Sequence, residues 1–205
     1  MLTGPHALQR LKEGNQRYRA GEHNRVAMAD QASRRATMDW QEPFAVILGC
    51  SDSRVPAELV FDQGVGDLFV IRVAGNVVAP SQIGSVEFAV AEFGTPLVVV
   101  MGHSRCGAVR ATLRELRQPT DLRSHNLQSI VDRIRPSIEG LLKTNLKDQP
   151  DALLKEAVSA NVRASVGQLT HGSKILEEMI MANRLSVVGA EYSLDTGKVT
   201  FYEQV

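Results

Sequence analysis

FAVILGC, residues 44–50, is a continuous apolar run of strand length that ends on a cysteine. Because both faces of such a run require burial, it is typical of a strand inside a parallel sheet. A second run, PLVVVMG at 96–102, is followed at once by His103. Residues 67–73 and 186–192 are also expected to be strands, with helical patterns between them. This alternation predicts an α/β fold with a mostly parallel central sheet and helices on both faces.

The two ends of the chain extend this core. Residues 5–19 and 24–39 have helical patterns, and the second has few large apolar side chains. A helix too polar to bury itself often lies against a partner. The turn at 195–197 precedes a last strand, which gives the sheet an antiparallel C-terminal edge. We therefore expect a single domain over residues 1–205, with 1–40 as an N-terminal helical arm.

Helices are expected after the second and third predicted strands. The first covers 81–93, with Ser81 as its N-terminal cap and Gly94 as its stop. The second begins at Ser104, after the apolar run that ends at 102, and continues to about Arg117.

The overall charge excludes several classes of partner. Lys and Arg number 23, and Asp and Glu number 23, so the formal net charge is zero. This balance argues against a nucleic-acid surface and against a polybasic membrane anchor. No apolar run approaches the roughly 18 residues that span a bilayer, and no signal-peptide pattern begins the chain. We expect a cytoplasmic protein without a membrane partner, unless a leader has been removed before Met1.

The cysteines are the most informative residues of the chain. Two cysteines, Cys50 and Cys106, cannot form a disulfide framework in 205 residues. Both follow predicted strands, and functional groups of open α/β sheets gather beyond the carboxyl ends of strands. If the two strands are neighbours, Cys50, Asp52, His103 and Cys106 converge at one edge. Two thiolates and an imidazole suit Zn²⁺, with Asp52 or a water as the fourth ligand.

Other interpretations of these cysteines remain open at this point. A buried cysteine at a strand end is often a small hydrophobic residue. A redox dithiol would normally show a Cys-x-x-Cys pair, which the sequence lacks. A phosphatase nucleophile would need an arginine six residues on, whereas Cys106 is followed there by Thr112 and Arg54 lies only four residues after Cys50. The position of both cysteines beside other ligand-type side chains favours the metal site.

The motifs around the cysteines closely resemble those of the β-class carbonic anhydrases. The resemblance rests on Cys-Ser-Asp-Ser-Arg at 50–54 together with His-Ser-Arg-Cys-Gly at 103–107. Arg-Val-Ala-Gly-Asn at 72–76 is similar to an Arg-Asn-x-x-Asn stretch of that family, with Val73 in place of the usual Asn. Gly-Ser-Val-Glu-Phe at 84–88 is similar to a helix of the family. The likeness extends over nearly the whole chain.

The resemblance implies an enzyme, a carbonate dehydratase of the zinc hydro-lyase type. Cys50, His103 and Cys106 would hold Zn²⁺, and a zinc-bound hydroxide would attack carbon dioxide to give bicarbonate and a proton. Asp52 and Arg54 would form a catalytic dyad in which Arg54 holds Asp52 off the metal by a bidentate ion pair. If that pair breaks, Asp52 would become a fourth ligand and close the site.

The same resemblance assigns residues to the substrate pocket. Phe69 and Phe88 would line it, with Ala74 nearby, and Gln41 would reach the active site across a dimer interface. The backbone N–H of Gly107, at the start of a helix, could bind anionic bicarbonate. Ordinary core packing or a surface position is the alternative for these side chains.

The subclass and the assembly also follow from the resemblance. Bicarbonate-inhibited bacterial members carry a tryptophan three residues before the first cysteine, where this chain has Ile47, and its single tryptophan is Trp40. We therefore expect a plant-type member without that inhibitory site, as a homodimer or homotetramer with the N-terminal helices over a partner. Hydrolysis of COS or CS₂ at the same zinc, or a non-catalytic structural zinc module, are the competing functions.

Overall fold

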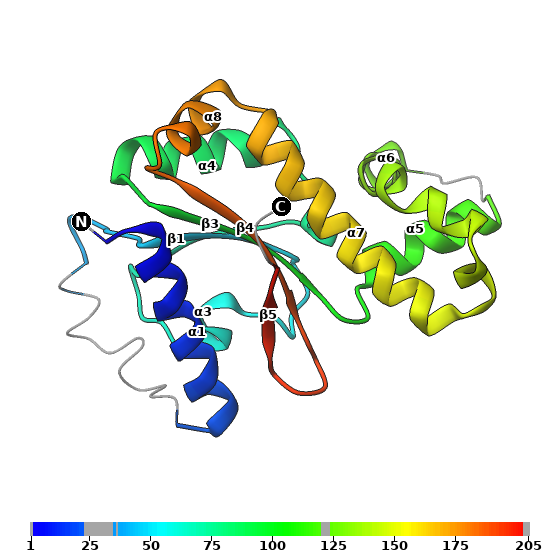
Figure 1. Ribbon diagram of the computed structural model, residues 1–205, viewed down its shortest axis with the longest axis horizontal. Helices are drawn as coiled ribbons and strands as arrows, with labels where there is room; N and C mark the ends of the chain where they lie inside the picture. Colours follow the sequence, from blue (N-terminus) through cyan, green and yellow to red (C-terminus); the bar gives the residue numbers. More distant parts are fainter. Residues whose placement is uncertain (1, 23–34, 36, 120–123, 203–205) are drawn as a thin grey trace.

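The computed structural model of the chain describes residues 2–22, 35, 37–119 and 124–202, and it confirms the predicted α/β fold (Figure 1). The strands of the described residues are β1 (Ala45–Gly49), β2 (Leu68–Arg72), β3 (Leu97–His103), β4 (Ser186–Tyr192) and β5 (Val199–Phe201). They form one sheet in the order β2-β1-β3-β4-β5. β1 to β4 are parallel, and β5 is the predicted antiparallel edge strand.

Helices cover both faces of this sheet. The α-helices of the described residues are α1 (Gly4–Ala20), α3 (Ala57–Val60), α4 (Pro80–Phe93), α5 (Gly107–Arg117), α6 (His125–Ile138), α7 (Pro150–His171) and α8 (Lys174–Met181). The 3₁₀ turns among them are η1 (Ala74–Asn76), η2 (Glu139–Lys143) and η3 (Asn145–Asp148). In Figure 1, α1 and α3 lie on one side of the sheet, and α4, α7 and α8 lie on the other. Most of the helix predicted at 24–39 lies outside the described residues, and its last three positions, 37–39, form a turn and a bend rather than a helix. Among the described helices, none has both the length and the apolar character needed to cross a membrane.

β1 shows why its sequence is apolar without interruption. Its side chains alternate between the two faces of the sheet. Ala45 and Ile47 therefore pack in the core between the sheet and helices α1 and α3. Val46 and Leu48 pack in the opposite core, against α4 and α7. Because every residue of this strand is buried, a polar side chain would lose its hydration on either face.

A further apolar cluster closes the carboxyl end of the sheet. It is built from α5, α6 and the first half of α7, which lie together beyond the strands in Figure 1. Ile134 and Ile138 of α6 are fully buried in it, beside both cysteines. The strand ends that carry the predicted ligands are therefore covered by apolar side chains.

The starts of two helices differ from the prediction. α4 begins at Pro80 with Ala79 as its N-cap, so Ser81 lies inside the first turn and does not cap it; proline is well suited to this first position. α5 begins at Gly107, not at Ser104, because Arg105 has a φ of 59° in the left-handed region. The residues between β3 and α5 therefore form a turn, with Cys106 as the N-cap of α5.

α1 packs onto the sheet of its own chain. Ala7 and Leu11 are fully buried against it. Asn15, also buried, donates from Nδ2 to the carbonyls of Val60 and Gly197 and accepts from the N–H of Val199 through Oδ1. These bonds tie α1 to α3 and to the β4–β5 hairpin.

Candidate metal centre

Strand register brings the predicted metal ligands together. β1 and β3 are neighbours, with Gly49 opposite Met101, so Cys50 and His103 leave the same edge of the sheet. The turn after β3 then returns Cys106 to this edge. The two sulfur atoms and a ring nitrogen of His103 lie within 4.8 Å of one another, and all three residues are buried. One ion can lie among them.

The surroundings of His103 fit a metal ligand. Its side chain is fully buried, and Nδ1 lies 3.0 Å from the carbonyl oxygen of Ser104. Nε2 has no hydrogen-bond partner among the described residues, and Oδ2 of Asp52 is 3.7 Å away. A buried ring nitrogen without a partner costs free energy. A proton on Nδ1, held by the Ser104 carbonyl, leaves the Nε2 lone pair free for a cation.

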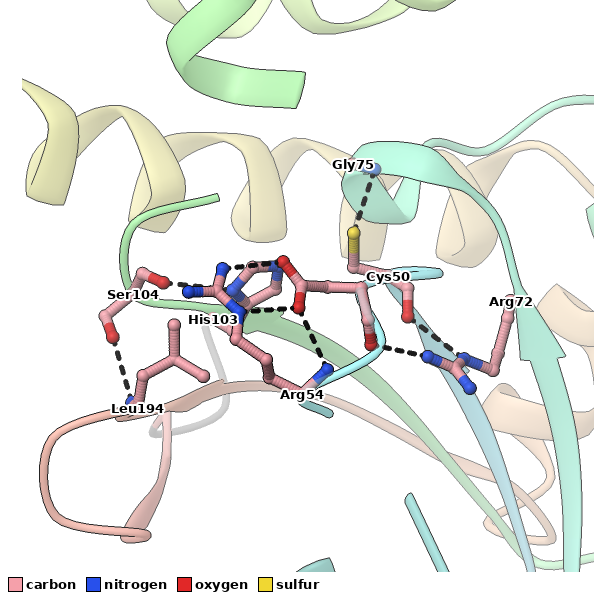
Figure 2. A network of polar contacts seen from close by, with 8 residues as sticks. Cys50, Arg54, Arg72, Gly75, His103, Ser104 and Leu194 are labelled. Atoms are coloured by element: carbon pink, nitrogen blue, oxygen red, sulfur yellow. Dashed lines mark hydrogen bonds and ion pairs between the residues drawn. The ribbon is translucent and has the colours of Figure 1, made fainter. Parts of the chain in front are cut away.

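The two thiols form a site that favours a cation. A hydrogen bond from Cys106 lowers the pKa of Cys50, against the effect of burial, and the same bond raises the pKa of Cys106. The N–H of Gly75 points at Sγ of Cys50 at 3.3 Å and favours the thiolate further (Figure 2). Burial lowers the pKa of His103, but the neighbouring Cys50 outweighs this and raises it overall. A divalent cation would displace the shared proton and hold both sulfurs as thiolates.

Asp52 lies at the rim of this cluster in a bidentate ion pair. Arg54 donates from Nε to Oδ1 and from Nη2 to Oδ2, both at 2.8 Å, and its backbone N–H donates to Oδ1 at 3.0 Å (Figure 2). These bonds hold the pKa of Asp52 well below its usual range. The ion pair expected from the sequence is therefore present, and it keeps an ionised carboxylate beside the ligands.

Two residues with contacts at the site were not assigned a role from the sequence. Arg72 donates to the carbonyls of Cys50 and Asp52, at 3.2 and 2.6 Å, and so fixes the turn after β1 (Figure 2). Gly75 has a φ of 71°, and an added Cβ would lie 2.8 Å from Cδ1 of Ile134. Both belong to the stretch at 72–76 that resembles the family, which was the available signal.

The predicted pocket residues divide into two groups. Ala74 precedes Gly75 in η1, and Gly107 follows Cys106, so both adjoin the cluster. Phe69 and Phe88 do not adjoin it within one chain. Phe69 pairs with Val46, four residues before Cys50 and therefore about 13 Å back along the strands.

Phe88 lies on α4 beside Phe69, with their ring centroids 6.2 Å apart. Gln41 is exposed and precedes β1, toward the opposite end of the strand from Cys50. Phe69, Phe88 and Gln41 could therefore line an active site only across an interface between chains.

Phe69, on the edge strand β2, and Phe88 belong to a partly exposed aromatic group. The ring of Phe93 has its centroid 5.6 to 6.2 Å from those of Trp40, Phe69 and Phe88. Phe88 is 54% exposed and Trp40 is 56% exposed. We call these four residues the aromatic patch. A monomer rarely exposes such a contiguous group, and an edge strand is usually protected.

A family model described as carbonic anhydrase matches residues 45–199. The chain belongs to the carbonic anhydrase family. Carbonic anhydrase 2 of Mycobacterium tuberculosis is 38% identical over 97% of this chain and 93% of its own length. A carbonic anhydrase of Mycolicibacterium smegmatis is 39% identical over 94% of this chain and 90% of its own length.

Solved structures place the fold in the β class of carbonic anhydrases. The crystal structure of the β-carbonic anhydrase CafA of Aspergillus fumigatus has a TM-score of 0.73 and 26% identity, covering 82% of this chain and 79% of that one. The family match contains the cysteine–histidine cluster and the Asp52–Arg54 pair. The resemblance based on the motifs is thus confirmed at the level of the family.

Proposed function

We propose that this carbonic anhydrase catalyses the reversible hydration of carbon dioxide to bicarbonate and a proton, with Zn²⁺ as its cofactor. The observation that carries the proposal is the convergence of Cys50, His103 and Cys106 beside the Asp52–Arg54 pair. A structural zinc site usually has four fixed protein ligands. Here Arg54 occupies both oxygens of the nearest carboxylate, which favours a site with an open position.

The ligand set determines what the metal would do. A zinc ion held by both sulfurs and by Nε2 of His103 would act as a Lewis acid that acidifies a bound water. Cys50 and Cys106 would contribute two negative charges, more than an all-histidine set, so we expect activity to increase toward alkaline pH.

Asp52 and Arg54 would orient the reacting water. The ionised carboxylate can accept a hydrogen bond and so direct an oxygen lone pair toward carbon dioxide. Arg54 keeps that carboxylate from becoming a ligand, because a guanidinium fork satisfies both of its oxygens at once.

Ala74 and Gly107 would form the part of the substrate pocket that belongs to the same chain. The methyl group of Ala74 suits an apolar substrate. The N–H of Gly107 lies at the start of α5, where the helix dipole favours an anion such as bicarbonate.

A homodimer would complete the pocket, alone or as half of a homotetramer. The aromatic patch has two exposed rings, includes a residue of the edge strand β2, and carries two of the predicted pocket residues. A two-fold interface over this patch would let Phe69 of the partner subunit, Phe88 of the partner subunit and Gln41 of the partner subunit approach the cluster.

Metal content and carbon dioxide hydration test this function together. We expect the wild type to contain one zinc per chain and to be active in stopped-flow assays, more so at pH 8.5 than at pH 7. Cys106→Ser should lose zinc and activity together while keeping its circular dichroism spectrum. Full zinc content in that variant would contradict the ligand assignment. Zinc without hydration at either pH would favour the structural module, and faster turnover of COS or CS₂ would favour the other substrates.

A further inference from the structure

The turn between two of the metal ligands is held in an unfavourable conformation. Arg105 lies between His103 and Cys106 and has a φ of 59°. An L-residue other than glycine rarely adopts this left-handed region, and it stays there only where surrounding contacts hold it. The position of Cys106 relative to His103 therefore depends on what holds this turn.

Contacts from the β4–β5 hairpin hold the turn. The backbone N–H of Ser104 donates to the carbonyl of Tyr192 at 2.9 Å. The side-chain Oγ of Ser104 accepts a hydrogen bond from the N–H of Leu194 at 3.0 Å (Figure 2). Arg105 donates from Nη2 to Oδ1 of Asp195 at 2.6 Å. The side chain of the strained residue is thus bound by a carboxylate 90 residues away in the chain.

The hairpin is itself firmly attached to the body of the protein. Asn15 of α1 binds the carbonyl of Gly197 and the N–H of Val199, both at 2.9 Å. Tyr192 pairs with Val199 across the hairpin. Asp195 is therefore presented from a fixed turn.

We propose that Asp195 is a positioning residue for the metal site, acting through Arg105 to hold the turn that places Cys106 beside His103. The inference rests on the proposed zinc function. Arg105 and Asp195 are both more than half exposed, so their contribution to global stability is small. The effect belongs to the metal site, because contacts that orient metal ligands change metal affinity even when the fold is intact.

Zinc dissociation from the holoenzyme provides the first test. Asp195→Asn keeps the shape of the side chain and removes its charge. It should accelerate zinc loss to a chelator by about 2- to 10-fold, below the range for residues bonded directly to a ligand. Asp195→Glu should restore most of the wild-type rate. Asp132→Asn is the matched control, because Asp132 is equally exposed and pairs with Arg135 on α6; its rate should equal that of the wild type.

A double-mutant cycle and a spectrum show whether Asp195 acts through Arg105. Arg105→Gly tolerates the positive φ without a side-chain contact, so adding Asp195→Asn to it should change the zinc rate no further. The absorption bands of the Co²⁺-substituted enzyme, which report ligand geometry, should shift in Asp195→Asn and stay unchanged in Asp132→Asn.

The outcomes separate this inference from the proposed function. Zinc-loaded wild type with an unchanged rate in Asp195→Asn would overturn the positioning role and leave the proposed function intact. An equal effect of Asp195→Asn in the Arg105→Gly background would also overturn it. A wild type that binds no zinc would contradict both proposals.

Discussion

At the scale of single residues, Arg54 binds the carboxylate that lies nearest to the cysteine–histidine cluster. Asp52 Oδ2 lies 3.7 Å from Nε2 of His103, close enough to compete for the same cation. Both carboxylate oxygens are instead occupied by the guanidinium group. Under the proposed function, this pairing would keep Asp52 as an acceptor that orients water and would prevent it from blocking the open position as a ligand.

Removing the guanidinium group should therefore reduce activity while zinc remains bound. We expect Arg54→Ala to lower carbon dioxide hydration by about 10- to 100-fold, as for other residues that orient metal-site groups. Arg54→Lys should restore only part of it, since an ammonium group cannot bind both oxygens in a fork. Arg163→Ala on α7 is the control, because Arg163 is 53% exposed against 55% for Arg54 and also pairs with a carboxylate, that of Glu156. Stopped-flow assays with metal analysis check this, and full activity in zinc-loaded Arg54→Ala would contradict the dyad.

The raised pKa of Glu191 predicts that the stability of the fold depends on pH. Burial in β4 raises its pKa; Tyr202 and the charge of Lys155 partly oppose this, and Glu156 adds to it. An acid with a raised folded pKa stabilises the fold below its unfolded pKa and loses that contribution as pH increases through the folded value. Wild-type stability should therefore decrease, relative to Glu191→Gln, as pH increases from about 4.5, the ordinary value for glutamate.

Urea unfolding of wild type and Glu191→Gln across pH 4 to 7 measures this difference. The comparison at each pH cancels the effect of acid on metal binding. Glu178→Gln, an exposed glutamate paired with Lys174, should show no such trend. Parallel pH profiles for wild type and Glu191→Gln would show that Glu191 has an ordinary pKa.

At the scale of elements, α1 depends on a close approach that glycine permits. A Cβ on Gly14 would lie 1.8 Å from the carbonyl oxygen of Phe61, at the end of α3. The contact is with a backbone atom, which cannot relieve the clash by changing rotamer as a side chain could. α1 therefore lies directly against the backbone of Phe61 at this point.

The same substitution should have opposite effects on two helices. Gly14→Ala should destabilise the protein by about 1–3 kcal/mol, the usual cost of overpacking. Gly167→Ala on α7 meets nothing within 4 Å, so it should stabilise by up to about 1 kcal/mol through helix propensity. Thermal or urea unfolding measures both, and a neutral Gly14→Ala would mean that α1 can shift away from α3.

The whole molecule is expected to depend on the aromatic patch for its assembly. Burying a phenylalanine contributes about 1.5–3 kcal/mol, and a two-fold interface uses each residue twice. Because only the exposed 54% of Phe88 remains to be buried, Phe88→Ser should weaken the dimer by about 1.6–3.2 kcal/mol, which is about 15- to 200-fold in the dissociation constant. Hydration activity should decrease as well, because the pocket would lose the phenylalanine side chain of the partner.

Light scattering after size-exclusion chromatography measures this change across a dilution series. Leu127→Ser on α6 is the matched control, since Leu127 is 57% exposed against 54% for Phe88. A wild type that is monomeric at all concentrations, yet fully active, would contradict the proposed completion of the pocket.

Much of this molecule could be predicted from local sequence patterns. The apolar run at 44–50 indicated a strand buried on both faces, and the structure has one. The cysteines after two such strands indicated a shared edge, because parallel strands end on the same side of a sheet. The convergence of Cys50, His103 and Cys106 could also be expected, since thiols and imidazoles are few in this chain and these three stand at strand ends.

Only the tertiary structure decided which distant residues meet. Sequence patterns did not show that Arg105 would adopt a positive φ, because the contact with Asp195 that holds it comes from the other end of the chain. They also did not separate Ala74, which adjoins the cluster, from Phe69, which does not. Local patterns depend on neighbours in the chain and therefore predict elements and their buried faces. Contacts across the fold depend on strand order, register and turn geometry, which form only when the elements pack together.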